Sequence, residues 1–185
     1  MDDRFSLLVD KYQDKVYNQA YRMLGNSEDA EDATQDVFLR IYRSIDTFRG
    51  ESKITTWIYS ITSNVCIDRL RKLQRHMVSI DDPFDEDGRT IAELIADEAP
   101  DPERELESKQ MAELVRAQVR TLPPNWAMAL SLNHFEGLSY DEIAEVMEIP
   151  KATVATYIFR GRKKLAEQLI TLMEPKNHLE IIGEG

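Results

Sequence analysis

Apolar residues recur at intervals of three or four in two separate parts of the chain, which is the spacing of helices that bury one face. In the first part this spacing indicates three helices within residues 1–75, with breaks at Gly25 and at Gly50. In the second part the spacing resumes at Met111 and continues to Leu172. The alternation typical of β-strands does not occur in the sequence. The sequence therefore predicts an all-α protein.

The stretch between the two periodic parts combines proline, glycine and carboxylates, as linkers do. Only residues 91–95 have the spacing of a short helix there. We expect two small helical domains joined by this acidic flexible linker. Their predicted bounds are 1–75 for the first domain, 76–110 for the linker, 111–173 for the second domain and 174–185 for a short tail.

The formal net charge of −11 is distributed unevenly along the chain. Residues 76–111 hold 12 acidic and 3 basic side chains, which is nearly all of the acidic excess. By contrast, residues 53–75 contain five Lys or Arg against one Asp, and residues 151–164 contain five against none. Two basic windows in an acidic chain point to a nucleic-acid partner, which the total charge alone would not suggest. We also expect the linker acids Asp81, Asp82, Asp85, Glu86 and Asp87 to screen these windows in the free protein.

Several classes of protein are excluded by the sequence. No uncharged run is long enough for a transmembrane helix, and the acidic start lacks the basic residues of a signal peptide. Cys66 is the single cysteine, and three separated histidines (His76, His134 and His178) fit no metal-binding spacing. Neither a glycine-rich phosphate loop nor a nucleophile elbow is present. We expect a cytoplasmic protein without enzymatic activity, cofactor, metal site or direct membrane insertion, with Cys66 as a buried, inert thiol.

The second domain ends in the pattern of a helix-turn-helix. Ser139 and Glu142 form a capping box that opens a short acidic helix, and a tight turn at 148–150 precedes a basic helix. In this motif the second helix enters the major groove of DNA. The candidates for base and phosphate contacts are Lys151, Thr153, Thr156, Tyr157, Phe159, Arg160, Arg162, Lys163 and Lys164. The alternative is an ordinary helical hairpin with a solvated basic face.

The first domain offers two further candidate surfaces. Basic and aromatic residues alternate around its third helix, a mixture that binds single strands through phosphates and stacked bases. These residues are Lys53, Trp57, Tyr59, Asn64, Arg69, Arg71, Lys72 and Arg75. Trp57 also fits the core, and the basic helix end also fits the helix dipole. The second surface is an acidic face beside two apolar side chains, which suits a basic partner helix or plain solvation. Its residues are Asp29, Asp32, Gln35, Asp36, Phe38 and Leu39.

Two sequence blocks are informative together: DAEDATQDVFLRIYRSIDTFRGESKITTWIYSITSNVCIDRLRK and, after the linker, LPPNWAMALSLNHFEGLSYDEIAEVMEIPKATVATYIFRGRKKL. With these blocks in this order, the chain resembles the extracytoplasmic-function (ECF) sigma factors of bacterial RNA polymerase, in the sigma-70 family, over roughly residues 5–172. It implies a subunit that binds core RNA polymerase, recognises a promoter and helps to open it. The acidic linker is similar to the segment that threads the RNA path of the polymerase.

The resemblance also implies roles for the candidate residues. The acidic face Asp29, Asp32, Gln35, Asp36, Phe38 and Leu39 would bind the clamp helices of the largest polymerase subunits. TFRGESKITTW, which contains Arg49, Lys53 and Trp57, would capture an unstacked base of the single-stranded −10 element. Asn64, Asp68, Arg69 and Arg71 lie in the helix that contacts this element, with Lys72 and Arg75 after them. Lys151 to Lys164 match the helix that reads the double-stranded −35 element.

The −35 helix departs from the family pattern. Ala155 and Tyr157 stand where the family commonly has basic residues, and Gly161 stands where Ala is usual. We infer a −35 element unlike the common family sequence, or weaker duplex binding offset by other contacts. The family also implies an anti-sigma factor as partner, often membrane-anchored.

Two other functions explain the sequence less completely. A sigma-like decoy that binds only an anti-sigma factor would not need Arg69, Arg71, Arg160, Arg162 and Lys163. A stand-alone helix-turn-helix regulator would leave the first domain unexplained and would normally need a dimerisation element.

Overall fold

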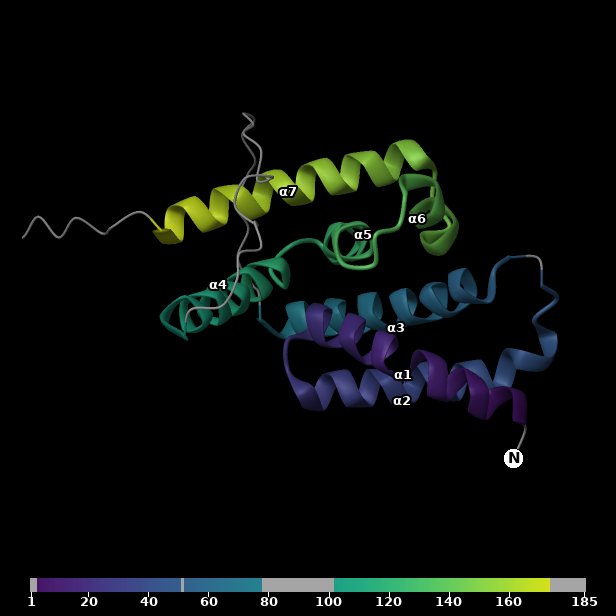
Figure 1. Cartoon of the computed structure of the whole chain (residues 1–185). Coiled ribbons are helices and arrows are strands. Elements are labelled where there is room, and N and C mark those ends of the chain that lie inside the picture. Colours follow the sequence, from purple (N-terminus) through teal and green to yellow (C-terminus); the bar gives the residue numbers. More distant parts are fainter. Residues whose placement is uncertain (1–2, 51, 78–101, 174–185) are drawn as a thin grey trace, which may run out of the picture.

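The computed structural model describes residues 3–50, 52–77 and 102–173 (Figure 1). Over these residues the chain forms α-helices and one short 3-10 helix, so the predicted all-α fold is confirmed. The helices are α1 (Asp3–Leu24), α2 (Ser27–Ser44), α3 (Ile54–Met77), α4 (Pro102–Val119), α5 (Pro124–His134), α6 (Tyr140–Met147) and α7 (Lys151–Met173), with η1 (Ile45–Thr47) after α2. Among the described helices, none is long and apolar enough to cross a membrane.

Helices α1, α2 and α3 pack around a shared apolar core and form the first unit. Gly25 ends α1 in a left-handed conformation (φ +81°), which glycine adopts without strain. Asn26 then caps α2, because its side-chain oxygen accepts a hydrogen bond of 2.8 Å from the Asp29 backbone N–H. The core side chains are Val16, Ala20, Met23, Ala33, Val37, Ile41, Ile58, Cys66 and Leu70.

Helices α4 to α7 form the second unit, in which α5 and α6 pack against α7. The predicted capping box is present: Ser139 accepts from the Glu142 N–H, and the Glu142 carboxylate accepts from the Ser139 N–H at 2.9 Å. Glu148 ends α6 with φ +54° and so makes the tight turn before α7. Gly161 lets α7 approach α5, since a Cβ at this position would lie 3.2 Å from Leu130 Cδ1.

Helix α4 begins at Pro102, inside the stretch predicted as linker up to residue 110. Proline is favoured at the first helical position, and glutamates follow in the first turn, where the helix dipole favours them. The expected short helix at 91–95 and the acids of the screening hypothesis lie outside the described residues.

The two units pack directly against each other. Helix α3 contacts α5 and α6, and α1 contacts α5 and α4 (Figure 1). One cluster of buried apolar side chains runs through both units. The side-chain amide of Gln74 on α3 donates to the backbone carbonyls of Arg120 and Leu122 at 2.8 Å each. The first unit is therefore hydrogen-bonded to the segment that joins α4 to α5.

Candidate nucleic-acid and partner-binding surfaces

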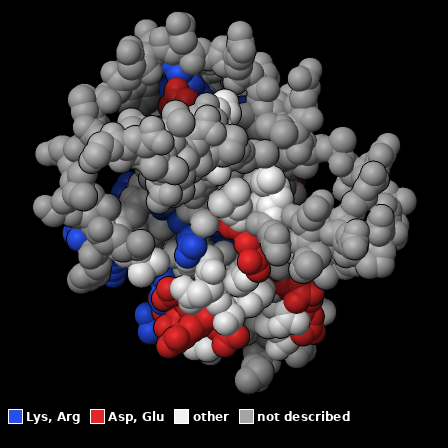
Figure 2. Space-filling model, turned by 90° about the vertical axis from the view of Figure 1, so that its left-hand side faces the viewer, with Lys and Arg blue, Asp and Glu red and all other residues white. Residues whose placement is uncertain are grey.

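The exposed face of α2 carries the predicted acidic surface together with an apolar groove. The groove has a volume of about 350 Å³ and is lined by Phe5, Gln35, Phe38, Leu39 and Tyr42. Leu39 and Tyr42 are 52% and 56% exposed, whereas Phe38 is almost buried. The rings of Phe5 and Tyr42 form a T-shaped pair, with centroids 5.1 Å apart. Figure 2 shows acidic side chains gathered on the lower part of the face that carries the turn between α1 and α2.

Two groove residues were not predicted from the sequence. Tyr42 lies three and four positions after Leu39 and Phe38, so helical spacing alone places it on the same face. Phe5 comes from α1, and only the packing of α1 on α2 brings it there. Exposed apolar side chains beside carboxylates suit a partner helix with one apolar and one basic face.

Arg69 joins the two surfaces that the sequence predicted separately. Its guanidinium on α3 donates a hydrogen bond to the Asp36 carboxylate on α2, and it lies 3.8 Å from Asp32. Arg69 is only 24% exposed at its side chain. The helix predicted to contact DNA and the helix predicted to bind polymerase therefore share a cluster of one cation and two carboxylates.

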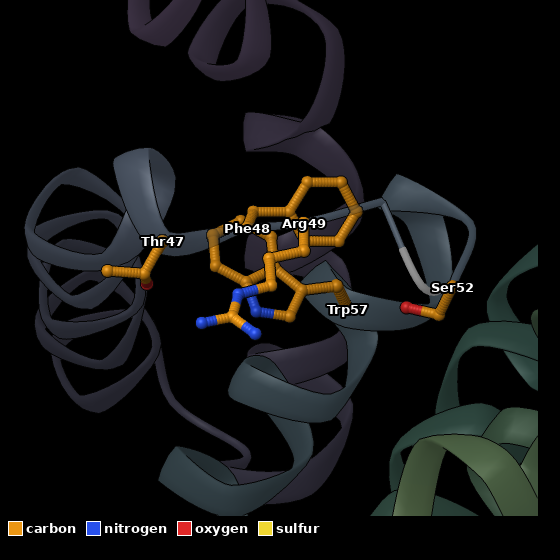
Figure 3. Close-up of a pocket in the computed structure, with 5 residues that line it drawn as sticks. All are labelled: Thr47, Phe48, Arg49, Ser52 and Trp57. Atoms are coloured by element: carbon orange, nitrogen blue, oxygen red, sulfur yellow. The ribbon is translucent and has the colours of Figure 1, made fainter.

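The loop between α2 and α3 forms an open pocket of about 330 Å³ (Figure 3). It is lined by Thr47, Phe48, Arg49, Ser52 and Trp57. The rings of Phe48 and Trp57 lie with centroids 4.9 Å apart and an interplanar angle of 35°. Trp57 is half-buried, because it packs on the core and lines the pocket at once. Trp57 is therefore part of the core packing and of the pocket lining, and its contact with a base stays a prediction. Aromatic faces beside a guanidinium and hydroxyls suit an unstacked base.

The other predicted −10 residues form one exposed stripe along α3. Asn64, Asp68, Arg71 and Arg75 are spaced by four, three and four residues, so they share a helix face. Asp68 accepts from Arg71 at 3.5 Å, and Arg71 also donates to the Asn125 side-chain oxygen on α5 at 3.4 Å. Lys72 is exposed beside this stripe, and Lys53 is exposed at the start of α3.

Helix α7 presents its predicted −35 residues on an exposed face behind the tight turn. Phe159 is 66% exposed, and Lys151, Thr156, Arg160, Arg162 and Lys164 are exposed too, while Thr153, Tyr157 and Lys163 are half-buried. Several of the cations have partners in the free chain. Lys151 donates to Asp141 at 2.8 Å, Arg162 donates to Asn133 at 3.0 Å, and Arg160 lies 5.9 Å from the centroid of the Trp126 ring.

Cys66 is fully buried, and desolvation raises the pKa of its thiol to about 12. This agrees with the predicted inert thiol, because the reactive thiolate is then suppressed at neutral pH. Over the described residues, no three His, Cys, Asp or Glu side chains lie together as a metal site.

Comparison with known proteins gives two family matches. Residues 8–76 match Sigma-70 region 2, and residues 112–165 match Sigma-70 region 4. The ECF RNA polymerase sigma factor SigW of Bacillus subtilis (strain 168) is 36% identical over 167 residues, which covers 90% of this chain and 89% of that protein. The ECF RNA polymerase sigma-E factor of Escherichia coli (strain K12) is 34% identical over 174 residues, covering 91% and 88%.

Two solved structures share the fold. The sigma factor RpoE in complex with the anti-sigma factor NepR, from Bartonella quintana, superposes with a TM-score of 0.62 at 20% identity, covering 90% of this chain and 97% of that one. CnrH in complex with the cytosolic domain of CnrY gives a TM-score of 0.61 at 21% identity, covering 90% and 88%.

Proposed function

Because the chain belongs to the ECF sigma factors of the sigma-70 family, which direct promoter-specific transcription initiation, we propose how its surfaces divide that work. The unit of α1–α3 binds core RNA polymerase and the −10 element. The unit of α4–α7 binds the −35 element. The chain acts by binding and not by covalent catalysis. The observation that carries this proposal is that the unit of α1–α3 holds both the α2 groove and the pocket of the α2–α3 loop.

The α2 face is the proposed site for core polymerase. Asp29, Asp32 and Asp36 offer negative charge, and Leu39 and Tyr42 offer exposed apolar contacts. Aromatic and apolar anchors inside a polar rim are the usual composition of a strong interface. The cationic face of a clamp helix complements this surface in charge.

The loop pocket is the proposed site for one unstacked base of the −10 element. Phe48 and Trp57 supply aromatic faces, and Arg49 supplies a cation for the adjoining phosphate. The exposed stripe from Asn64 to Arg75 continues away from the pocket along α3, as a backbone-tracking surface would. Arg69 lies on the same helix, and its guanidinium is paired with Asp36 in the free chain.

Helix α7 is the proposed reader of the −35 duplex. The capped α6 and the tight turn at Glu148 present the first turns of α7 as a helix-turn-helix does. Arg160 is suited to a guanine edge, and the exposed Phe159 ring is suited to a thymine methyl group. Arg162, Lys163 and Lys164 lie farther along the helix and serve phosphates.

An anti-sigma factor is the proposed regulator, and its anchoring in the membrane is part of the same proposal. RpoE and CnrH, which share the fold, were solved in complexes with such a factor and with the cytosolic domain of CnrY, respectively. The acidic linker is proposed to enter the RNA path of the polymerase.

Run-off transcription tests the proposed function. Purified core polymerase is incubated with genomic fragments, with and without the protein, and new transcripts are mapped. Asp32→Lys should abolish both core binding and the transcripts, whereas Asp14→Lys makes the same charge change on the exposed face of α1 and should leave both intact. If the wild-type protein fails to bind core at all, the decoy or the stand-alone regulator takes the place of this proposal.

A further inference from the structure

Glu136, in the turn between α5 and α6, reaches across to the first unit and bonds to two of its helices. One carboxylate oxygen accepts from Arg22 on α1 at 2.7 Å, and the other accepts from the Tyr59 hydroxyl on α3 at 2.6 Å. The side chains of Glu136 and Arg22 are 10% and 27% exposed, so the ion pair is partly buried. Burial and this carboxylate together raise the pKa of Tyr59 above its usual value, which keeps the hydroxyl a donor.

Arg22 makes a second contact with the same turn. Its guanidinium lies 4.5 Å from the centroid of the Phe135 ring. The ring is 48% exposed, so its contact with the first unit is one-sided. The turn 135–136 is therefore held by an ion pair, a hydroxyl and a cation–π contact, all from the first unit.

The surrounding interface has polar features of a contact that opens. Gln19 on α1 is fully buried against Met128 on α5, and its amide nitrogen lies 3.1 Å from the Met128 sulfur. Among the described residues, the Gln19 amide oxygen has no hydrogen-bond partner. A buried amide oxygen without a hydrogen-bond partner costs free energy, which a permanent core avoids and which water removes when the units part.

A second polar contact lies at the end of α1. Arg120 extends over Gly25 and donates to the Leu24 carbonyl at 3.4 Å, and a Cβ on Gly25 would lie 2.5 Å from the guanidinium. The Arg120 Nε has no partner among the described residues either. Besides the shared apolar cluster, the units are thus joined by specific polar contacts that water can replace.

The closed arrangement is incompatible with simultaneous reading of both promoter elements. By their names, the −10 and −35 elements lie about 25 base pairs apart, which is about 85 Å of duplex at about 3.4 Å per base pair. The longest described helix, α3, has 24 residues and is only about 36 Å long at about 1.5 Å per residue. Two units bonded through Glu136 do not span that distance, so the interface must open when both elements are bound.

We propose that Glu136 is a latch residue that holds the two DNA-binding units together in the free chain, with Arg22 and Tyr59 as its receiving site. In the free chain, the second unit therefore covers the face of α1 and α3 that carries Arg22 and Tyr59, until promoter and polymerase separate the two units. This inference rests on the proposed function, because Tyr59 and Arg71 lie on the helix proposed to contact the −10 element. Arg71 is held in the same closed form by Asn125.

Fluorescence energy transfer on the full chain tests the latch. Dyes are attached at Asp14→Cys on α1 and Thr171→Cys on α7, both exposed positions outside the interface and the proposed binding surfaces. The native Cys66 is buried with a raised pKa and stays unlabelled. The free wild-type chain should give a single short distance. Glu136→Ala should shift the ratio of open to closed molecules by roughly tenfold, as expected for loss of a coupled buried contact.

Two further variants separate a latch from a folding defect. Arg22→Met leaves the Glu136 carboxylate with one donor and should also open the chain. Glu167→Gln removes an exposed carboxylate from α7 and should keep the short distance. Helix content measured by circular dichroism should be the same in every variant. Addition of core polymerase should bring wild type and Glu136→Ala to the same long distance.

The outcomes distinguish this inference from the proposed function. A long distance in the free wild-type chain overturns the latch, as does a short distance in a folded Glu136→Ala protein, even if run-off transcription succeeds. Conversely, an absence of transcripts together with a latch that opens in Glu136→Ala refutes the proposed function and leaves the contact established.

Discussion

Arg69 on α3 and Asp36 on α2 form an ion pair that links the proposed DNA-contacting helix to the proposed polymerase-binding helix. A cationic clamp helix that binds Asp32 and Asp36 would compete with Arg69 for the same carboxylates. Pairing with Arg69 should therefore stabilise the fold but weaken the binding of these carboxylates to the polymerase.

We expect Asp36→Asn to lower the free energy of unfolding by about 0.5–1 kcal/mol, because the pair is partly exposed and is screened by water. Urea denaturation measures the change, and a double-mutant cycle with Arg69→Met isolates the coupling. The control is the exposed Asp68–Arg71 pair, whose coupling should be near zero. Equal coupling in both pairs would contradict the special position of Arg69.

Tyr42→Ser should weaken binding to core polymerase by roughly tenfold, because an exposed aromatic anchor of the groove is lost. Stability should change little, since the side chain is more than half exposed. Affinity for labelled core enzyme measures the effect. Ile170→Ser, an equally exposed apolar position on α7, is the matched control and should bind core normally.

Trp57→Ala should impair promoter opening by the polymerase complex, because stacking on an aromatic face contributes about 1–3 kcal/mol per unstacked base. The fluorescence of 2-aminopurine placed in the −10 element reports the opening. Trp57→Phe keeps an aromatic face and should retain part of the activity. Full opening by a folded Trp57→Ala protein would exclude the pocket as a base-binding site.

Ala155→Arg should restore a phosphate contact on α7 and steepen the dependence of log affinity on log salt by about 0.9. The measurement is promoter binding by the polymerase complex over a series of salt concentrations.

Arg160→Ala should lose about 1–3 kcal/mol of binding free energy at one base position if Arg160 reads a base. An equal loss across all promoter variants would assign Arg160 to a phosphate.

Ser139→Ala should destabilise the second unit more at neutral pH than in acid. The backbone N–H and the hydroxyl of Ser139 both donate to the Glu142 carboxylate and lower its pKa in the folded chain, and Ser139→Ala removes the bond from the hydroxyl. A lowered folded pKa stabilises the fold above the unfolded pKa of about 4.3, and this stabilisation is lost as the pH falls through the folded value. Thermal melts measure this effect: the difference in melting temperature between wild type and Ser139→Ala should be smaller at acid pH than at neutral pH.

Local patterns in the sequence predicted the features that depend on near neighbours. The Ser139–Glu142 capping box and the exposed face of α7 follow from spacing within one or two turns. The start of α4 was missed because its first turns are polar and carry no apolar period, while proline at the first helical position is a weaker signal.

Contacts between distant segments were beyond such reasoning. Phe5 enters the α2 groove from another helix, and Glu136 is a single carboxylate without a local pattern. The pairing of Arg69 with Asp36 joins residues of two separately predicted surfaces, and their proximity depends on how α2 packs on α3. Only the assembled fold shows these relations.

The apolar cluster that runs through both units has a consequence for evolution. Two units that merely shared a chain could be exchanged freely between relatives. Here Gln19 and Gly25 on one half are matched to Met128 and Arg120 on the other. A chimaera should therefore keep the closed arrangement of the free chain only when both interface surfaces come from the same parent. Each unit then limits how fast the sequence of the other can diverge.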